Sequence, residues 1–377
     1  MSTSPANDVP AVHRRAIIVD GHCDTPYRLF RHNVHLDEHD TEAQADLASL
    51  QASGITASFF AAYVPPFYAN RGAAQFAHKL IDVIRTEAAR RSDVLTFCSD
   101  SAGIRTAKRD GKIALMIGVE GGHAIEDSLD TLRELYARGA RYLTLTHVNT
   151  NNWCDSSGDA PRHGGLTSFG REVVQTMNDL GMIVDISHVS DAAFAHVIET
   201  TRTPIVATHS SCRALCRHPR NMTDDMLRAL ANNGGVCMLN FFSAFISDEV
   251  AQVIMQAQRR PKKESDGTGG TEEMPDDRTD WATYLEWFQT LGCPRATLDQ
   301  VADHVLHAVN VAGIEHVGIG SDFDGVPALP DGLTTAAMLP SLTALLLRRG
   351  LSEADVEKIL GGNFLRTFEA IENARVR

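Results

Sequence analysis

Short apolar runs alternate with longer amphipathic segments along this chain of 377 residues. Most of the runs are too short for helices and are continuously apolar, which is typical of strands buried on both faces of a parallel sheet. There are eight of them, at 16–24, 55–64, 112–122, 140–147, 182–188, 204–210, 234–242 and 316–325. The chain shows no repeat of fixed period, so a solenoid or propeller is not indicated.

The segments between the runs have helical spacing. In residues 73–91 the apolar positions recur every three or four residues, as on one face of a helix. Residues 168–181 run from a candidate cap at Ser168 to a glycine, and residues 297–313 run from Thr297 to a glycine. Two further helical segments follow the eighth apolar run.

Eight strand–helix units predict a TIM-like (β/α)8 barrel, with residues 1–377 forming a single domain. A doubly wound open sheet is the main alternative, but it should show a glycine-rich phosphate turn after the first strand, and GHCDTP is not one. Residues 246–296 do not fit the alternation and include a charged, glycine-rich stretch. We interpret 246–296 as an insertion between the seventh and eighth units, either a surface loop or a lid.

The composition excludes several classes of protein. The net charge of −13 argues against binding to nucleic acid, which needs clustered Lys and Arg. No apolar run approaches the roughly 18 residues of a membrane span, and the N-terminal sequence has no signal-peptide core. We therefore expect no membrane association and a cytoplasmic location. Seven cysteines without a CxxC pair predict reduced, mostly buried thiols.

Polar residues that can carry chemistry stand at the C-terminal ends of the apolar runs. In a parallel barrel these ends meet at one mouth, where active sites are built. The residues are His22, Asp24, Glu120, His147, His188, His209, Asp322 and Asp324.

Each of these residues has an ordinary structural interpretation when taken alone. His22 and Asp24 share one side of a strand by alternation, but such a pair is weak evidence of a metal. Glu120 alone could cap a helix, and a single buried histidine is more often a core residue. Taken together, however, buried imidazoles and carboxylates are costly unless they are paired or bind a metal.

The set of donors indicates which metal to expect. Imidazole and carboxylate without thiolate suit zinc, with manganese or cobalt as alternatives. Cys23 should point to the opposite face of its strand and is not expected to be a ligand. Five ligands exceed the usual three of a catalytic zinc, so we predict two ions that share Glu120. Two such ions, about 3.5–4 Å apart, would hold a bridging hydroxide and polarise a carbonyl. The predicted ligands are His22, Asp24, Glu120, His188 and His209.

Seven motifs in order resemble the membrane dipeptidase (renal dipeptidase) family, peptidase family M19 of the amidohydrolase superfamily. The resemblance runs from about residue 16 to residue 370, and the closing segment GGNFLRTFE is also similar to that family. The motifs are DGHCD (20–24), GVEGGHA (118–124), LTLTHVNTN (143–151), DISHVS (185–190), THSSCRAL (208–215), HPRNMTD (218–224) and GIGSDFDG (318–325).

The resemblance implies a binuclear zinc enzyme that hydrolyses dipeptides. It implies His22, Asp24 and Glu120 on one zinc, and Glu120, His188 and His209 on the other. Family members often accept a D-residue at the C-terminal position, and some open β-lactam rings. Family analogy also favours a homodimer.

The resemblance further implies roles for residues that do not bind metal. His147 would contact the substrate carbonyl, and Asp322 would shuttle protons. Arg220 would hold the terminal carboxylate of the substrate, because a guanidinium matches a carboxylate bidentately. Tyr63 and Tyr68 are candidate substrate contacts in the loop after the second strand.

Two other residues near the predicted site receive structural interpretations. We expect Asp324 to stabilise a turn and Cys154 to be a bystander thiol.

Two other functions compete with the dipeptidase. Another amidohydrolase, such as a deaminase, lactonase or β-lactam or amide hydrolase, commonly carries HxH on the first strand and a carboxylated lysine. This chain has HxD and Glu120 instead. A barrel that has lost catalysis should lack a ligand or Asp322, and none is missing.

Overall fold

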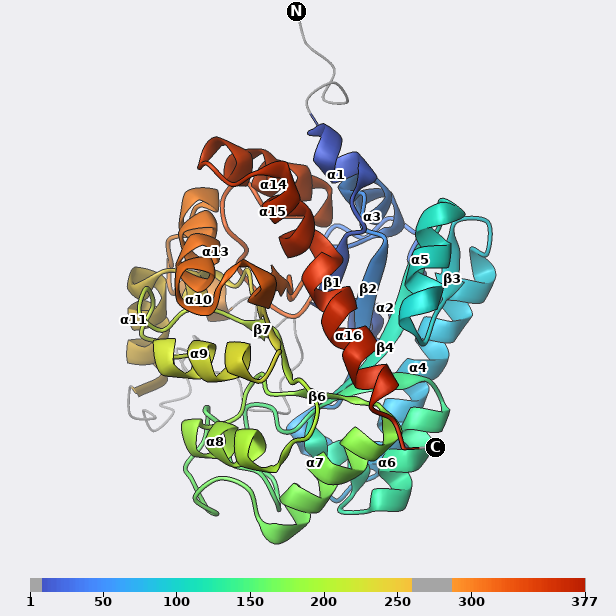
Figure 1. Cartoon of the computed structure of the whole chain (residues 1–377), viewed down its shortest axis with the longest axis vertical. Coiled ribbons are helices and arrows are strands. Elements are labelled where there is room, and N and C mark those ends of the chain that lie inside the picture. Colours follow the sequence, from blue (N-terminus) through green and yellow to red (C-terminus); the bar gives the residue numbers. More distant parts are fainter. Residues whose placement is uncertain (1–8, 260–286, 377) are drawn as a thin grey trace, which may run out of the picture.

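A closed barrel of parallel strands forms the centre of the computed structural model, which describes residues 9–259 and 287–376 (Figure 1). Pairing runs in order from β2 through β1 and β9 back to β4, and hydrogen bonds between β2 and β4 close the ring. This confirms the predicted (β/α)8 barrel. Its strands are β1 Val19–Cys23, β2 Ala57–Tyr63, β4 Ile113–Glu120, β5 Ala140–Thr144, β6 Ile183–Asp185, β7 Val206–Ser210, β8 Val236–Leu239 and β9 Val317–Ile319.

Each predicted run contains one barrel strand, but one further strand was not predicted. The short β3 (Leu95–Phe97) pairs alongside the beginning of β4 and stands outside the ring. Three residues, of which Leu95 is buried and the other two are partly buried, are too few to produce an apolar run.

Helices surround the barrel and several end-caps follow directly from the sequence. Thr297 caps α13 in a reciprocal pair with Gln300, as its position predicts. The cap of α7 is Thr167, whose side chain accepts a hydrogen bond from the Gly170 amide, so the prediction of Ser168 is wrong by one residue. Thr167 has the extended backbone of a cap, and the helix begins at the next residue.

The α-helices with described bounds are α1 Ala11–Arg15, α2 Thr25–His32, α3 Leu47–Ser53, α4 Ala73–Arg90, α5 Ser101–Arg109, α6 Leu129–Ala137, α7 Ser168–Leu180, α8 Asp191–Thr200, α9 Asp224–Asn232, α10 Ser243–Ile246, α11 Asp248–Arg259, α13 Leu298–Ala312, α14 Leu339–Arg348, α15 Glu353–Glu357 and α16 Asn363–Asn373. Short helical turns lie at η2 Pro66–Tyr68, η3 Gly122–Ile125, η4 Ile314–His316, η5 Ala336–Met338 and η6 Lys358–Gly362.

The predicted insertion 246–296 is partly helical. Its first part contains α11, where Val250 and Ile254 are buried four residues apart on one face of the helix. Residues 260–286 lie outside the described residues, and the lid stays a prediction.

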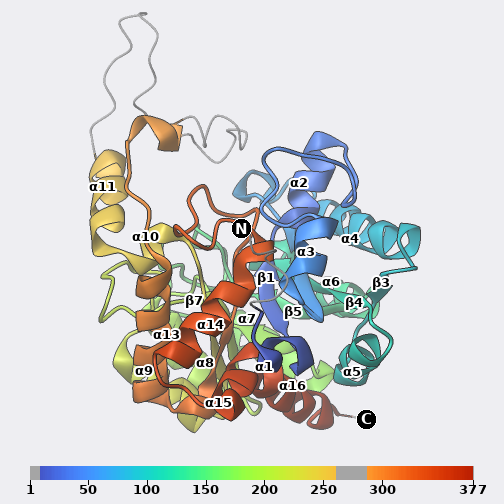
Figure 2. The same cartoon turned by 90° about the horizontal axis from the view of Figure 1, so that it is seen from above.

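The barrel interior is filled at the end where the strands begin. Val19, Ala57 and Ala114, near the starts of their strands, pack with Phe364 and Phe368 of α16. Helix α16 crosses the barrel in Figure 1, and in Figure 2 it lies with α15 at the opposite side from α2 and α11. The apolar contacts therefore close one end and leave the C-terminal ends of the strands for polar side chains.

The seven cysteines are free thiols, six of them buried and Cys293 partly exposed. The burial agrees with the predicted mostly buried thiols, and their reduced state stays a prediction. Within residues 9–259 and 287–376, no helix has the length and apolarity needed to cross a membrane.

Candidate active site

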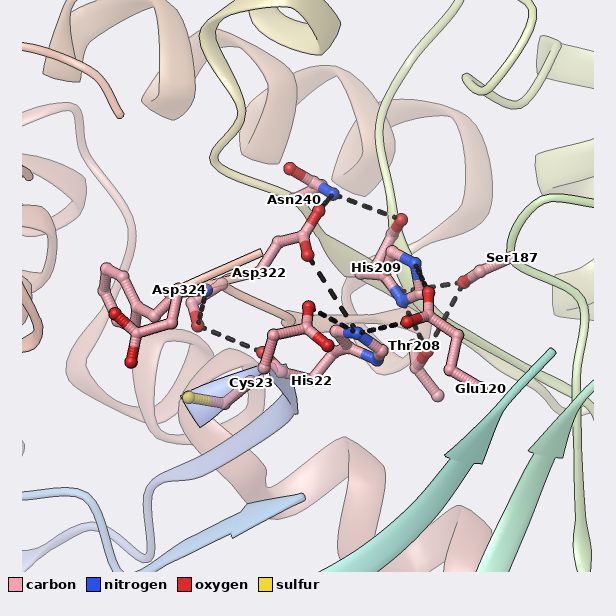
Figure 3. Close-up of polar contacts among 12 residues, drawn as sticks. His22, Cys23, Glu120, Ser187, Thr208, His209, Asn240, Asp322 and Asp324 are labelled. Atoms are coloured by element: carbon pink, nitrogen blue, oxygen red, sulfur yellow. Dashed lines mark hydrogen bonds and ion pairs between the residues drawn. The ribbon is translucent and has the colours of Figure 1, made fainter. Parts of the chain in front are cut away.

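The strand-end residues meet around the carboxylate of Glu120, the last residue of β4 (Figure 3). Oxygen Oε2 of Glu120 lies 3.5 Å from Nε2 of His22. The other oxygen, Oε1, lies 3.1 Å from Nε2 of His188 and 3.4 Å from Nε2 of His209. The two oxygens of Glu120 thus face imidazoles on different sides.

Two more carboxylates and a further imidazole complete the cluster. Oδ2 of Asp24 lies 3.3 Å from His22 Nε2, and Oδ1 of Asp322 lies 4.0 Å from the same nitrogen. His147 Nε2 is 3.8 Å from Glu120 Oε1. The structure therefore brings together the five predicted ligands, His147 and Asp322.

Irregular strand pairing sets the side-chain directions of two histidines, His22 and His209. Between Asp20 and Cys23, β1 has one residue more than β2 opposite it, and His22 lies in this bulge. Strand β7 has the same extra residue relative to β8 between Ala207 and Ser210, around His209. Bulges of this kind redirect side chains beside active sites.

The approach of Asp24 to His22 has a different cause from the one we predicted. Strict alternation fails, because β1 is bulged at His22 and ends at Cys23, and Asp24 is the N-cap position of α2. The turn into the helix brings the carboxylate to the imidazole. Cys23 does point away from His22, as predicted (Figure 3). Its Sγ lies 3.0 Å from Thr25 Oγ1.

Two residues of the cluster have backbone conformations that are uncommon outside glycine. His188 has φ 71° and Asp322 has φ 65°. Such positions cost on the order of 1–3 kcal/mol each and tend to occur at functional sites. The Asp322 amide donates to the carbonyl of His22, and the carbonyl of His188 accepts from Ser157, so hydrogen bonds hold both positions.

Residues behind the cluster orient its members. The Tyr142 hydroxyl lies 2.7 Å from Nδ1 of His22. Gly118 makes room for that ring, since a Cβ there would stand 1.9 Å from its Cζ. Asn240 donates from Nδ2 to Oδ2 of Asp322 at 2.7 Å.

Neither Asn240 nor Tyr142 was predicted from the sequence, for different reasons. Asn240 follows β8 directly, so the rule that selected the other strand-end residues could also have found it. Tyr142 stands inside an apolar run and looks like a core aromatic residue.

Burial and neighbouring charges shift the ionisation of the cluster strongly. Burial lowers the pKa values of His188 and His209 well below their usual range, which favours neutral imidazoles. Burial alone would raise the pKa of Glu120, but His22 holds it well below its ordinary value. Burial raises the pKa of Asp24 to about 8, against the effect of His22. Ionised Glu120 and neutral His188 and His209 are in the forms that bind divalent metals. The pKa of His22 is raised well above its usual range by Glu120 and Asp24, against the effect of burial, so His22 and Asp24 would have to lose protons when a cation binds.

The donor atoms suit metal ions. Three overlapping groups have ligand atoms within 4.8 Å of one another, and all of their donors are nitrogen or oxygen. Oδ1 of Asp24 is buried and has no hydrogen-bond partner among the described residues. A divalent cation would satisfy that oxygen and reduce the repulsion among three carboxylates. The groups are His22–Glu120–His209, Glu120–His147–His188 and His22–Asp24–Asp322.

Arg220 lies beside the cluster with part of its guanidinium free. It is 7% exposed, its Nη2 donates to the His209 carbonyl at 3.2 Å, and its guanidinium carbon lies 5.2 Å from the centre of the Phe245 ring. Its Nε and Nη1 have no partner in the part of the chain described. Burial lowers its pKa to about 10, partly offset by Asp322, so the group stays charged near neutral pH. A buried cation with two unused donors suits an anionic group of a ligand.

The two candidate tyrosines have different surroundings. The Tyr63 ring centre lies 4.8 Å from that of His147, at the edge of the cluster. Tyr68 stacks on Phe76 of α4 at 4.2 Å, so it contributes to packing there.

Asp324 and Cys154 have contacts that agree with structural roles. Asp324 accepts hydrogen bonds from Thr25, Arg28 and the Gln44 amide. Cys154 is buried, and its thiol lies 3.7 Å from the Asp155 carbonyl oxygen.

Comparison with known proteins identifies the family. The sequence profile described as membrane dipeptidase (peptidase family M19) matches residues 6–377. The chain belongs to the M19 family. As an M19 protein it is a metallo-dipeptidase. The cluster around Glu120 contains the candidate metal-binding groups found among the described residues.

Individual relatives agree with the family assignment. The M19 chain is 35% identical over 376 residues to "Dipeptidase verJ" of Clonostachys rogersoniana, covering 96% of this chain and 85% of the relative. A crystal structure of the probable dipeptidase PvdM from Pseudomonas aeruginosa matches with a TM-score of 0.82 and 25% identity, over 98% of this chain and all of that one.

A third match concerns the fold. The metallopeptidase of Rhodobacter sphaeroides, liganded with a phosphinate mimic of the dipeptide L-Ala-D-Ala, has a TM-score of 0.75 and 24% identity. The match covers 94% of this chain and 99% of that one.

Proposed function

We propose that this M19 dipeptidase uses two zinc ions that share Glu120. The supporting observation is that Oε2 of Glu120 faces His22, while its Oε1 faces both His188 and His209. Asp24, 3.3 Å from Nε2 of His22, would complete the first ion's ligands. His188 and His209, whose Nε2 atoms are 2.9 Å apart, would hold the second ion.

Different residues would transfer the proton and stabilise the oxyanion during hydrolysis. When bound, zinc ions supply an activated water and polarise the carbonyl of the scissile bond. Asp322 faces the cluster with Oδ1 while Asn240 holds its Oδ2, a position from which it can pass a proton to the leaving amine. Burial lowers the pKa of His147 to about 4, so this imidazole is neutral near pH 7. Its N–H group can donate a hydrogen bond to the developing oxyanion.

Dipeptides with a D-residue at the C-terminus are the first substrates to test, since the family resemblance implies them. The Rhodobacter sphaeroides protein was crystallised with a mimic of L-Ala-D-Ala, so L-Ala-D-Ala is a reasonable first dipeptide to test on this chain. We propose L-Xaa-D-Xaa dipeptides as substrates beside L-Xaa-L-Xaa. Lactones and β-lactams, the alternative substrates, serve as the comparison panel.

The function is tested by measuring amino-acid release from both dipeptide series before and after metal removal. We expect elemental analysis to find about two zinc ions per chain, because Glu120 can serve two sites. Chelated protein should be inactive and should recover on addition of zinc. Full dipeptidase activity without metal, or lactone hydrolysis exceeding that of every dipeptide, would contradict the proposal.

Arg220→Ala should weaken dipeptides selectively. Loss of a buried, charge-assisted contact to the terminal carboxylate is expected to lower kcat/KM about 10- to 100-fold. The same substitution should affect C-terminally amidated dipeptides much less. Arg217→Ala is the matched control, because Arg217 lies in the same loop, is 76% exposed at its side chain and pairs with Asp248. Equal losses on free and amidated substrates would remove Arg220 from carboxylate recognition.

We also propose the homodimer and the cytoplasmic location that the sequence analysis favours. Sedimentation of the purified protein measures the first, and fractionation of cells that produce it measures the second.

A further inference from the structure

A further carboxylate, outside the cluster, lies fully buried next to it. Asp185, the last residue of β6, has no exposed surface and accepts hydrogen bonds from four donors. Its Oδ2 accepts from the hydroxyls of Thr144 at 2.6 Å and Thr208 at 2.7 Å. Its Oδ1 accepts from the amides of Ser187 at 3.0 Å and Thr208 at 2.9 Å. In each of these four contacts the carboxylate oxygen is the acceptor.

The Thr208 hydroxyl joins this carboxylate to a proposed metal ligand. Its oxygen lies 2.8 Å from Nδ1 of His209 (Figure 3). A hydroxyl has one proton, and Thr208 gives its proton to Oδ2 of Asp185, the acceptor in that contact. The oxygen of Thr208 must then accept the proton of His209 Nδ1. The remaining nitrogen, Nε2, therefore carries a lone pair and faces Glu120 Oε1.

We propose that Thr208 and Asp185 are positioning residues that fix the proton of His209 on Nδ1 and keep Nε2 free to bind the metal. The inference rests on the metal centre proposed above. Partners of the ring nitrogen turned away from the metal orient a ligating histidine and its tautomer in this way.

The other two histidines lack such a fixed chain. His22 faces the Tyr142 hydroxyl, which can donate or accept. Nδ1 of His188 has no hydrogen-bond partner among residues 9–259 and 287–376. The Asp185–Thr208 chain is thus specific to His209 within the described structure.

Two threonines on the same carboxylate oxygen provide a matched experiment. Thr208→Val and Thr144→Val each remove one buried hydroxyl from Asp185 Oδ2, but only Thr208 contacts His209. We expect Thr208→Val to weaken zinc binding at one site about 10- to 100-fold, measured by competition with a chelator. Thr144→Val should bind zinc nearly as the wild type does, and Thr208→Ser should restore the affinity.

Thermal unfolding of the metal-free proteins separates positioning from folding. Similar losses of melting temperature in the two valine variants, with different zinc affinities, would support the inference. Equal zinc affinities in the two variants, or no restoration by serine, would overturn it. A wild-type protein that binds no zinc would instead overturn the metal centre itself.

Asp185→Asn provides an independent test if Thr208→Val does not fold. The amide oxygen can still accept from the two backbone amides, while its NH2 group faces the two threonine hydroxyls. Thr208 must then accept from this NH2 group and give its own proton to His209 Nδ1, which moves the imidazole proton to Nε2. We expect one zinc site to be lost while the protein stays folded; two zinc sites of wild-type affinity would contradict the inference.

Discussion

Replacing Glu120 with glutamine is expected to give a folded protein that retains little metal and almost no activity. An amide lacks the negative charge that the two proposed cations would share, and its NH2 group would face one of the imidazoles that now surround the carboxylate. Loss of metal polarisation is worth several kcal/mol, so kcat/KM should fall by about 10³-fold or more. Elemental analysis and dipeptide hydrolysis measure the two effects.

Glu126→Gln is a suitable control for that experiment. Glu126 is exposed, lies six residues after Glu120 in the chain and accepts a long hydrogen bond from the Ala74 amide at 3.4 Å. It should keep both metal and activity. Two retained zinc ions in Glu120→Gln would show that Glu120 does not bridge them.

Replacing Asp322 with asparagine should separate metal binding from turnover. The new side chain can still accept the hydrogen bond from Asn240 through its amide oxygen, but it cannot carry a proton between water and the leaving amine. Loss of a general acid–base group typically costs about 10²- to 10⁴-fold in rate. We expect kcat to fall within this range while the zinc content stays unchanged.

Asp324→Asn is the comparison for this second experiment. Asp324 lies two residues away but points to Arg28, Thr25 and Gln44 rather than to the cluster. The variant should therefore unfold at a lower temperature and keep its turnover number. If Asp322→Asn retained the wild-type kcat, the proton-shuttle role would have to be given up.

The sequence predicts the barrel and the cluster around Glu120 for one shared reason. Parallel strands bring their C-terminal ends to one mouth of the barrel. A polar residue at the end of an apolar run is therefore predicted to lie at this mouth, even when none of its contacts is known. His22, Glu120, His188 and His209 are all found by this rule. It also covers Asn240, which the analysis did not select.

Other parts of the site depend on spatial relations that no pattern in the chain contains. The bulge at His209 is a mismatch between β7 and β8, and neither strand shows it alone. Tyr142 and Thr208 contact histidines, but both lie inside apolar runs of the sequence. An aromatic residue or a threonine there cannot be told from an ordinary core residue. Strand β3 is too short to give a periodic signal.

A row of aromatic rings links the far end of the barrel to His22, a proposed metal ligand. Phe364 of α16 packs on Phe59 at 5.4 Å, Phe59 packs on Tyr142 at 5.2 Å, and the Tyr142 hydroxyl meets His22. The aromatic packing at the start of the barrel thus extends to the proposed active site. A substitution in this row is therefore expected to change both the stability of the barrel and the position of His22.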